Sequence, residues 1–174
     1  GFGRFLLYGT YFPTLVSGPI SSFGEMGGQF SQVHKFEYDQ VTGGMQRMLW
    51  GFFKKLVISE RLALVVNTVF NDYGNYSGFF YWIAAVFFVL QLYTDFSGCM
   101  DIVLGLSQTF GLILPENFRT PFFSKSVAEF WRRWHITLGN WMKNYVFYPL
   151  LRTDAFTKLG GSLRNKLGKK TGKQ

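Results

Sequence analysis

Apolar and polar stretches alternate along the chain, and one apolar stretch is long enough to cross a membrane. Residues 78–94, GFFYWIAAVFFVLQLYT, contain no charged side chain. A helix needs roughly 17–25 apolar residues to span the hydrocarbon core of a bilayer. The stretch therefore predicts a membrane-spanning helix near the lower limit of length. A second apolar run, residues 102–114, follows after the carboxylates Asp95 and Asp101.

Another uncharged stretch occupies residues 5–23, but Pro13 and Pro19 interrupt it. A proline lacks a backbone N–H and disrupts the helix around it, and lipid offers no replacement hydrogen bond. This stretch predicts either a broken or re-entrant membrane helix or a loop packed on other helices. Residues 25–40, which include His34, are polar and predict a surface connection.

The segment from Gln40 to Phe70 has apolar side chains at spacings of three and four, which is typical of a helix. Asp39 is a suitable N-cap because its carboxylate can accept hydrogen bonds from free backbone N–H groups. We expect the first half to lie at the membrane interface and residues 62–70 to enter the membrane or a protein core. The apolar stripe comprises Met45, Met48, Leu49, Phe52, Phe53 and Leu56, and the cations Arg47, Lys54 and Lys55 lie off it.

A further helix is predicted from Ser126 to Tyr148. Ser126 and Glu129 have the spacing of a capping box, in which each side chain bonds the backbone N–H of the other residue. Pro149 would end this helix. The charges along it favour a position in the membrane interface or beside a wet cleft. Its apolar face would carry Val127, Trp131, Trp134, Leu138, Trp141 and Tyr145, with His135 at the edge.

The composition favours a membrane protein over a soluble domain. Aromatic residues make up 20% of the chain and charged residues only 16%, whereas about 25% charged residues is usual. Aromatic side chains are enriched in the interfacial belts of membrane proteins. Together with the helical periodicity, the composition predicts an all-α fold of multi-pass membrane helices with re-entrant or interfacial amphipathic helices.

The positive charge is concentrated at the end of the chain. The formal net charge is +8, and residues 152–174 contain seven Lys and Arg against one Asp. Cytoplasmic loops of membrane proteins are enriched in these cations. The distribution predicts a membrane domain in residues 1–150 and a basic polar loop in residues 151–174, on the cytoplasmic side. No nucleic-acid recognition motif is present and the chain is too apolar for a soluble binder, so nucleic acid is not an expected partner.

Asp95 and Asp101 lie at the polar junction between the two apolar runs. A carboxylate at membrane depth usually faces a cavity or a partner cation. The alternative is that both residues cap helix ends at the interface, where an acid beside a helix N-terminus is favourable. Gly98 between them would permit a sharp bend or the close approach of another helix.

Residues 130–138, FWRRWHITL, place His135 among aromatic and basic side chains. Imidazole is the side chain whose ordinary pKa suits proton transfer near neutral pH. The alternative is a structural histidine whose ring nitrogens are bonded by neighbouring groups. No other ligand lies three or four residues away, so no metal site is predicted. A Ser-His-Asp triad cannot be assembled from the spacing either.

The same block resembles the signature of the membrane-bound O-acyltransferase (MBOAT) family, in the branch that acylates cell-surface polysaccharides. That branch includes alginate O-acetyltransferases and teichoic-acid D-alanyl transfer proteins. Four further blocks are similar to the branch, in the same order, and together they cover most of residues 11–150. They are Tyr11-Phe12-Pro13 with Ser17-Gly18-Pro19-Ile20, then Gly51-Phe52-Phe53-Lys54-Lys55-Leu56-Val57-Ile58, then Tyr93-Thr94-Asp95-Phe96-Ser97-Gly98 with Asp101-Ile102, and Leu114-Pro115-Glu116-Asn117-Phe118.

The resemblance implies a multi-helix membrane fold around a tunnel and an enzyme of the bacterial cytoplasmic (inner) membrane. Such an enzyme transfers an acetyl or similar acyl group to hydroxyls of a cell-surface polysaccharide or teichoic acid. The implied donor is acetyl-CoA or an acyl carrier protein, with no tightly bound cofactor. The implied partners are membrane lipid and an extracytoplasmic polysaccharide-modifying protein. The alternative function is a non-catalytic membrane scaffold or pore component.

By resemblance, His135 matches a tunnel-lining histidine of the family and is the candidate catalytic residue. A second family histidine lies on a later membrane helix, beyond residue 174, so we expect an internal fragment that is inactive alone. Two features depart from the family pattern, since Asn144 stands where many members have Asp and residues 148–152 replace a common ending. The candidate substrate-binding or tunnel-lining residues are Trp131, Arg132, Arg133, Trp134, Asp95, Ser97 and Asp101, in which the two arginines would bind either donor phosphate or lipid headgroups.

Overall fold

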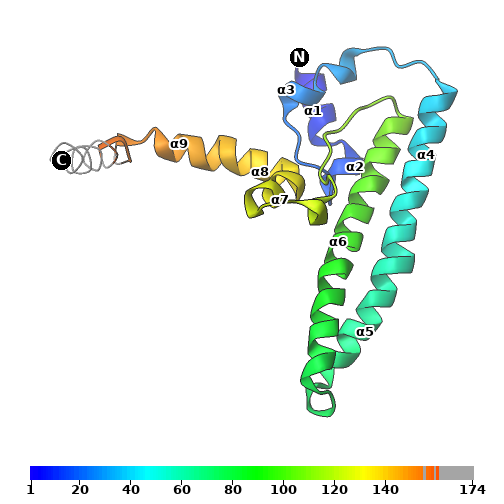
Figure 1. The fold of residues 1–174 in the computed structure, drawn as a ribbon. Helices are drawn as coiled ribbons and strands as arrows, with labels where there is room; N and C mark the ends of the chain where they lie inside the picture. Colours follow the sequence, from blue (N-terminus) through cyan, green and yellow to red (C-terminus); the bar gives the residue numbers. More distant parts are fainter. Residues whose placement is uncertain (155, 159, 161–174) are drawn as a thin grey trace.

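Two long antiparallel helical segments are the largest elements of the fold (Figure 1). The computed structural model of the protein describes residues 1–154, 156–158 and 160. The first segment comprises α4 (Tyr38–Phe52), the π-helical stretch η2 (Phe53–Ser59) and α5 (Glu60–Asn71). After the short turn η3 (Tyr73–Asn75), the second segment is α6 (Gly78–Thr109). No strand occurs in these described residues, which confirms the all-α prediction.

The helix α6 is continuous, so the prediction of two apolar segments with a polar junction was wrong. Its 32 residues include Asp95, Gly98 and Asp101 without a break. The polar residues are accommodated because cations of α4 and η2 face them. Gly98 allows the close approach of another helix rather than a bend: a Cβ there would lie 2.8 Å from the carbonyl oxygen of Gly51 on α4.

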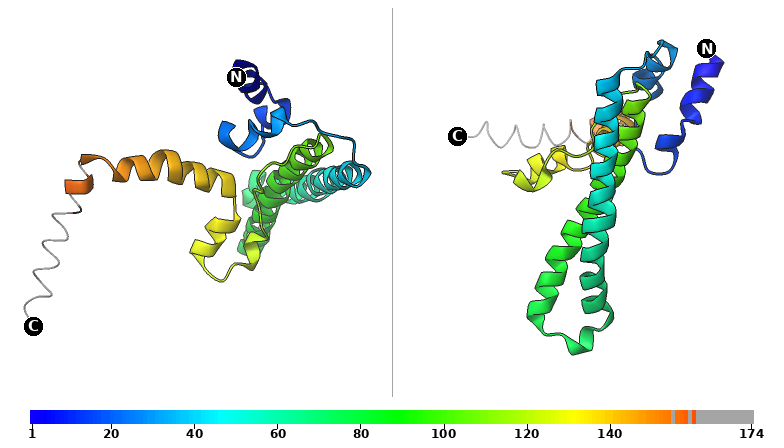
Figure 2. Two further views of the ribbon diagram at one scale, coloured as in Figure 1. Left: turned by 90° about the horizontal axis from the view of Figure 1, so that it is seen from above. Right: turned by 90° about the vertical axis from the view of Figure 1, so that its right-hand side faces the viewer.

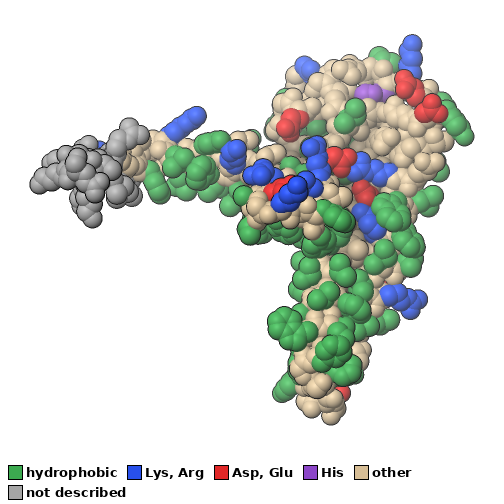
Figure 3. Space-filling view, viewed as in Figure 1, with side chains coloured by type: hydrophobic (Ala, Val, Ile, Leu, Met, Phe, Trp, Pro, Cys, Tyr) green, Lys and Arg blue, Asp and Glu red, His purple; other side chains and the backbone are tan. Residues whose placement is uncertain are grey.

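The apolar side chains of α6 largely face outward. Among the described residues it is the one helix long and apolar enough to cross a membrane, and 6% of its apolar window is buried. A core helix of a soluble protein would instead be mostly buried. Figure 3 shows hydrophobic side chains over the lower part of this face, along α5 and the start of α6, with basic side chains gathered at the level of α7.

The start of α4 differs from the prediction at Asp39. The helix begins at Tyr38 after Glu37, and no side-chain cap bond forms there. Asp39 lies inside the first turn, where its negative charge interacts favourably with the positive end of the helix dipole. The predicted apolar stripe of α4 and η2 is mostly exposed, whereas Arg47 and Lys54 turn toward carboxylates of α6 and of the chain after it.

The N-terminal region is interrupted, as its prolines predict. It contains α1 (Phe2–Gly9), α2 (Phe12–Leu15), α3 (Phe23–Met26) and the turn η1 (Gln29–Ser31). The hydroxyl of Tyr11 donates to Ser107 Oγ of α6 at 3.0 Å, which ties this region to the long helix pair. A small buried core forms at this contact from Tyr11, Met26, Met100, Val103, Leu104, Leu112 and Leu114.

The predicted continuous helix from Ser126 to Tyr148 was wrong. After the turn η4 (Pro121–Phe123), α7 (Val127–Arg133) ends, and α8 (Ile136–Trp141) begins after His135, whose φ is +45°. The break separates the tryptophans of α7 from the residues after His135. The π-helical η5 (Met142–Phe147) and α9 (Tyr148–Leu151) continue α8 as an arm that projects from the helix pair (Figure 2).

Pro149 does not end the helix where we expected. It occupies the first turn of α9, where a missing N–H costs least. Most of the predicted basic loop, residues 151–174, lies outside the described residues. Its side of the membrane and the domain boundary at residue 150 therefore stay predictions.

Candidate functional site

His135 lies at the junction of α7 and α8, beside the loop that follows α6. Its left-handed backbone turns the chain so that the loop and the junction run next to each other. The backbone N–H of Ile136 donates to the carbonyl oxygen of Asn117 at 3.0 Å, and that of Arg119 donates to the carbonyl of Arg133 at 2.9 Å. These two bonds hold the imidazole over residues 117–119.

Asn117 provides the main hydrogen-bond acceptor of the site. Its side chain is fully buried, and its Oδ1 accepts bonds from the backbone N–H and the Oγ1 of Thr137, at 3.1 and 3.0 Å. The same oxygen lies 3.1 Å from Nδ1 of His135. The Oγ1 of Thr137 in turn accepts the backbone N–H of Ile20 at 3.1 Å. The N-terminal region, the loop and α8 therefore meet at this amide.

The contact with Asn117 identifies the tautomer of the neutral His135 ring. The backbone N–H of Thr137 can only donate, so the atom it bonds must be the amide oxygen of Asn117. That oxygen can only accept, so Nδ1 of His135 carries the proton. In the neutral imidazole, Nε2 then has a free lone pair. The histidine is suited to accept a proton or a hydrogen bond from a substrate.

Aromatic rings enclose the imidazole. The ring of Phe96 contacts it edge-on at 4.7 Å between centroids, and the ring of Phe118 lies at 6.5 Å. Burial lowers the pKa of His135 from its ordinary value of 6.5, because the charged imidazolium loses water. The histidine is therefore mainly neutral at pH 7. Trp134 packs on Phe118 at 5.1 Å and so contributes to this aromatic wall.

An ionic cluster lies next to Asn117. Arg47 bonds both carboxylate oxygens of Glu116 at 2.7 Å, and its Nε donates to Asp101 at 3.0 Å. Lys54 pairs with the other oxygen of Asp101 at 2.6 Å and donates to Ser97 at 3.0 Å. The cluster joins α4, η2 and α6 to the loop after α6. A cavity of about 240 Å³ lies beside the cluster and is lined by Lys54, Ser97, Asp101, Glu116, Asn117 and Arg119 among others.

Asp95 belongs to a separate ion pair. Its carboxylate accepts from Lys55 Nζ at 2.6 Å, and its side chain is 47% exposed, compared with 17% for Asp101. Both carboxylates therefore lie inside α6 and pair with cations of α4 and η2, and neither caps a helix end. Of the three candidate residues on α6, the structure brings Ser97 and Asp101 to the cavity beside Asn117 and leaves Asp95 outside it.

The candidates on α7 are only partly brought to the site. Trp134 joins the aromatic wall, whereas Trp131 is 62% exposed and Arg132 is exposed. Arg133 pairs with Glu129 at 2.6 Å. The serine half of the predicted capping box forms, but Glu129 accepts from Lys125 N instead of Ser126 N. The complete capping box of the described chain is at Ser22 and Glu25, which we did not predict.

Four residues of the site were missed by reasoning from the sequence: Asn117, Thr137, Arg47 and Glu116. Asn117 and Glu116 lie in one of the family-like blocks, which was a usable signal. No spacing rule joins Arg47 to Glu116 or Thr137 to Asn117, because these contacts depend on the tertiary fold. Within the described part of the chain, no group of three or more His, Cys, Asp and Glu is placed to hold a metal ion.

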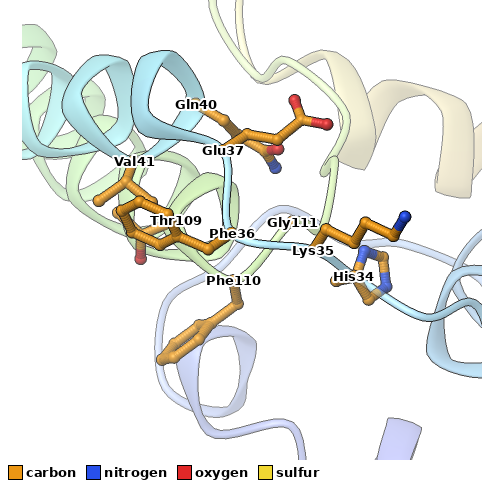
Figure 4. A pocket seen from close by; sticks show the side chains of 9 residues that line it. All are labelled: His34, Lys35, Phe36, Glu37, Gln40, Val41, Thr109, Phe110 and Gly111. Carbon is orange, nitrogen blue, oxygen red and sulfur yellow. The ribbon is translucent and has the colours of Figure 1, made fainter.

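His34 is far from this site in the fold. It lies between η1 and α4, and its Nε2 donates to the carbonyl oxygen of Gln29 at 2.8 Å. A pocket of about 140 Å³ lies beside it. Figure 4 shows His34 and Lys35 at one end of this pocket and Val41 and Thr109 at the other. His34 contacts neither His135 nor Asn117, so it serves below as a control position.

An apolar helix of spanning length lies beside a histidine held by an amide and aromatic rings, which is consistent with a helical membrane protein with a site suited to proton transfer. Comparison of sequences gives a more specific class. The chain matches the membrane-bound O-acyltransferase (MBOAT) family over residues 1–164 and belongs to that family.

Named relatives come from several bacteria. The chain is 36% identical over 146 residues to a probable alginate O-acetylase AlgI of Pseudomonas syringae pv. tomato, covering 84% of this chain and 28% of the relative. It is 34% identical over 148 residues to a peptidoglycan O-acetyltransferase of Helicobacter pylori, covering 84% and 28%. It is 30% identical over 148 residues to a teichoic acid D-alanyltransferase of Bacillus subtilis, covering 83% and 37%. The chain thus spans 28% to 37% of the lengths of these relatives.

Proposed function

We propose that this chain is part of a membrane O-acyltransferase that transfers an acetyl or similar acyl group to hydroxyls of a cell-surface polysaccharide or teichoic acid. Membership of the family and the names of the relatives support this activity. The observation in the structure that carries the proposal is the 3.1 Å contact between Nδ1 of His135 and Oδ1 of Asn117. It leaves Nε2 of a half-buried neutral imidazole free for a hydroxyl group.

The chemistry of acyl transfer uses such a nitrogen. The hydroxyl oxygen forms a bond to the acyl carbonyl carbon, the bond from that carbon to the sulfur of a thioester breaks, and the hydroxyl proton moves to a base and then to the leaving thiolate. A positioned imidazole contributes about 10²- to 10⁴-fold to such a step. The resemblance implies a second histidine as the base, so we assign to His135 the holding and orienting of the hydroxyl at Nε2.

The donor and the surroundings follow from the same proposal. The acyl donor is acetyl-CoA or an acyl carrier protein, and no tightly bound cofactor is required. The whole protein is a multi-pass protein of the bacterial inner membrane, in contact with lipid and with an extracytoplasmic polysaccharide-modifying partner. The outward-facing apolar surface of α6 supports contact with lipid.

Replacement of His135 in the full-length protein tests the proposal. His135→Ala should reduce acylation of the polymer by about 100-fold or more, because it removes the group that orients the hydroxyl. His34→Ala is the matched control and should retain activity, since His34 lies away from the site. Acylation would be measured by release of ester-linked acyl groups from the polymer. Wild-type activity of His135→Ala would contradict the role proposed for His135.

A further inference from the structure

We propose that Asn117 is a positioning residue for His135 and that Arg47 holds Asn117 in place through Glu116. This inference rests on the proposed function of His135 and extends it to two residues that do not meet substrate. Its basis is a continuous series of contacts from α4 to the imidazole.

The first contact is the arginine fork. Arg47 bonds both oxygens of Glu116 at 2.7 Å and one oxygen of Asp101 at 3.0 Å. A planar guanidinium with two parallel bonds to a carboxylate fixes direction as well as distance. Glu116 is the residue before Asn117, so the fork anchors the loop immediately next to the amide. Asp101 anchors the same arginine to α6.

The second contact is the amide itself. Asn117 is fully buried, and its Oδ1 meets three donors: the backbone N–H of Thr137, the hydroxyl of Thr137 and Nδ1 of His135. Its Nδ2 contacts the sulfur of Met100 on α6 at 3.2 Å. The oxygen therefore cannot turn away from the imidazole without breaking buried hydrogen bonds.

The third step links this placement to chemistry. A neutral imidazole can carry its proton on either nitrogen, and the bond made by one nitrogen decides the state of the other. With Asn117 in place, the proton stays on Nδ1 and Nε2 is free. If the loop shifts or the acceptor is removed, the proton can occupy Nε2 instead, which then cannot accept the hydrogen bond that orients the hydroxyl. Arg47 would therefore affect the reaction through the tautomer of His135.

A neighbouring ion pair offers a matched control. Lys55 and Asp95 also join η2 to α6, at 2.6 Å, but they have no contact with residues 116–117. Loss of Lys55 would test whether any ionic link between these helices supports the site. Only the arginine fork, in our proposal, continues into the loop that carries Asn117.

The experiment uses the full-length protein in membranes, with Asn117→Asp, Asn117→Leu, Arg47→Met, Arg47→Lys and Lys55→Met. Two measurements are made on each variant: the pH profile of acyl transfer and the ¹⁵N spectrum of labelled histidine, with the His135 signal assigned by His135→Gln. The spectrum distinguishes the two neutral tautomers without requiring activity.

Asn117→Asp retains an acceptor for Thr137 and should fold, but its carboxylate favours the imidazolium. It should move the acid limb of the pH profile upward by about one to three units. Asn117→Leu and Arg47→Met should give mixed tautomers and reduce activity by about 10- to 100-fold, the size of effect known for loss of a partner that orients a metal-bound histidine. Arg47→Lys should recover part of this loss, and Lys55→Met should match the wild type in tautomer and acid limb.

Three results are distinguishable. An unchanged His135 signal and an unchanged acid limb in Asn117→Asp would overturn the positioning role, even where His135→Ala abolishes acyl transfer. Equal effects of Arg47→Met and Lys55→Met on the tautomer would overturn the specific role of the fork. Full activity of His135→Ala would instead overturn the proposed function on which this inference rests.

Discussion

Gly51 of α4 and Gly98 of α6 contact each other through their backbones. A Cβ added to Gly51 would lie 2.7 Å from the carbonyl oxygen of Gly98, and a Cβ on Gly98 would lie 2.8 Å from that of Gly51. A second reciprocal contact joins Gly44 to Gly105 seven residues away on each helix. The two contacts allow α4 and α6 to approach closely, which brings Arg47 and Lys54 within reach of Asp101.

Replacement of Gly98 by Ala should destabilise the helix pair. The new methyl group would meet backbone, which cannot move aside as a flexible side chain can. Overpacking of this kind costs about 1–3 kcal/mol, while the better helix propensity of Ala returns about 0.5–1 kcal/mol. Thermal unfolding in detergent would measure the change. Gly78→Ala on the same helix is the control, because nothing lies within 4 Å of its added Cβ, and it should not lower the stability.

The two carboxylates of α6 should differ in their effect on stability. Asp101→Asn leaves Arg47 and Lys54 short of a countercharge in a site where the Asp101 side chain is 17% exposed. Loss of one partner from a buried pair costs about 3–5 kcal/mol, and the residual exposure here lowers that figure. Asp95→Asn affects a pair that is 37% and 47% exposed, for which about 0–1 kcal/mol is usual.

The comparison is made on both variants under the same conditions, by denaturant or thermal unfolding. A larger loss for Asp101→Asn than for Asp95→Asn is expected. Equal losses would mean that the ionic cluster around Arg47 adds nothing beyond an exposed ion pair.

The fold class followed from periodicity and composition, and individual helix ends did not. The apolar run at residues 78–94 predicted the start of α6, but the helix continues to Thr109 because Lys54, Lys55 and Arg47 neutralise its carboxylates. Those cations lie on a different segment of the chain. A pattern within one segment therefore could not show that the charged residues of α6 would be tolerated.

The candidate site was likewise predicted only in part from the sequence. The block around His135 identified the histidine, but its helical periodicity suggested one continuous helix. The structure instead has His135 at φ +45°. Two backbone hydrogen bonds between the turn and the loop after α6 hold this conformation, from Ile136 to Asn117 and from Arg119 to Arg133. Non-glycine residues rarely adopt this conformation without support from the tertiary structure. Asn117 and Thr137 supply further support, and no spacing in the sequence joins them.

Thr137 links three segments, because its hydroxyl both accepts and donates a hydrogen bond. It accepts the backbone N–H of Ile20 at 3.1 Å and donates to Asn117 at 3.0 Å. Thr137→Val keeps the shape and leaves the N–H of Ile20 without this acceptor. Such a loss costs about 1–3 kcal/mol for a fully buried group, and the partial exposure of this hydrogen bond lowers that figure. Thr137→Ser keeps the hydroxyl and should lose clearly less stability. Similar losses in the two variants, measured by thermal unfolding, would show that the methyl group matters and the hydroxyl does not.

The lowered pKa of His135 predicts how stability and activity depend on pH. Burial lowers this pKa from 6.5, so between the lowered value and 6.5 the folded protein binds fewer protons than the unfolded chain. The stabilising contribution is fully present above pH 6.5 and is lost as the pH falls through the folded pKa. Over the same range Nε2 remains unprotonated, so acyl transfer should persist below pH 6.5.

The pH profile of kcat/KM of the full-length protein measures this, with His34→Ala as the control that should leave the acid limb in place. The ionisation that His135 contributes to the acid limb should lie below pH 6.5 and should disappear when His135 is replaced by Gln, because Gln does not titrate. A His135 ionisation above pH 6.5 would mean that the pKa of the imidazole is raised and not lowered. Phe96, Phe118 and a neutral amide do not raise it. A carboxylate from another part of the protein would then have to lie beside it.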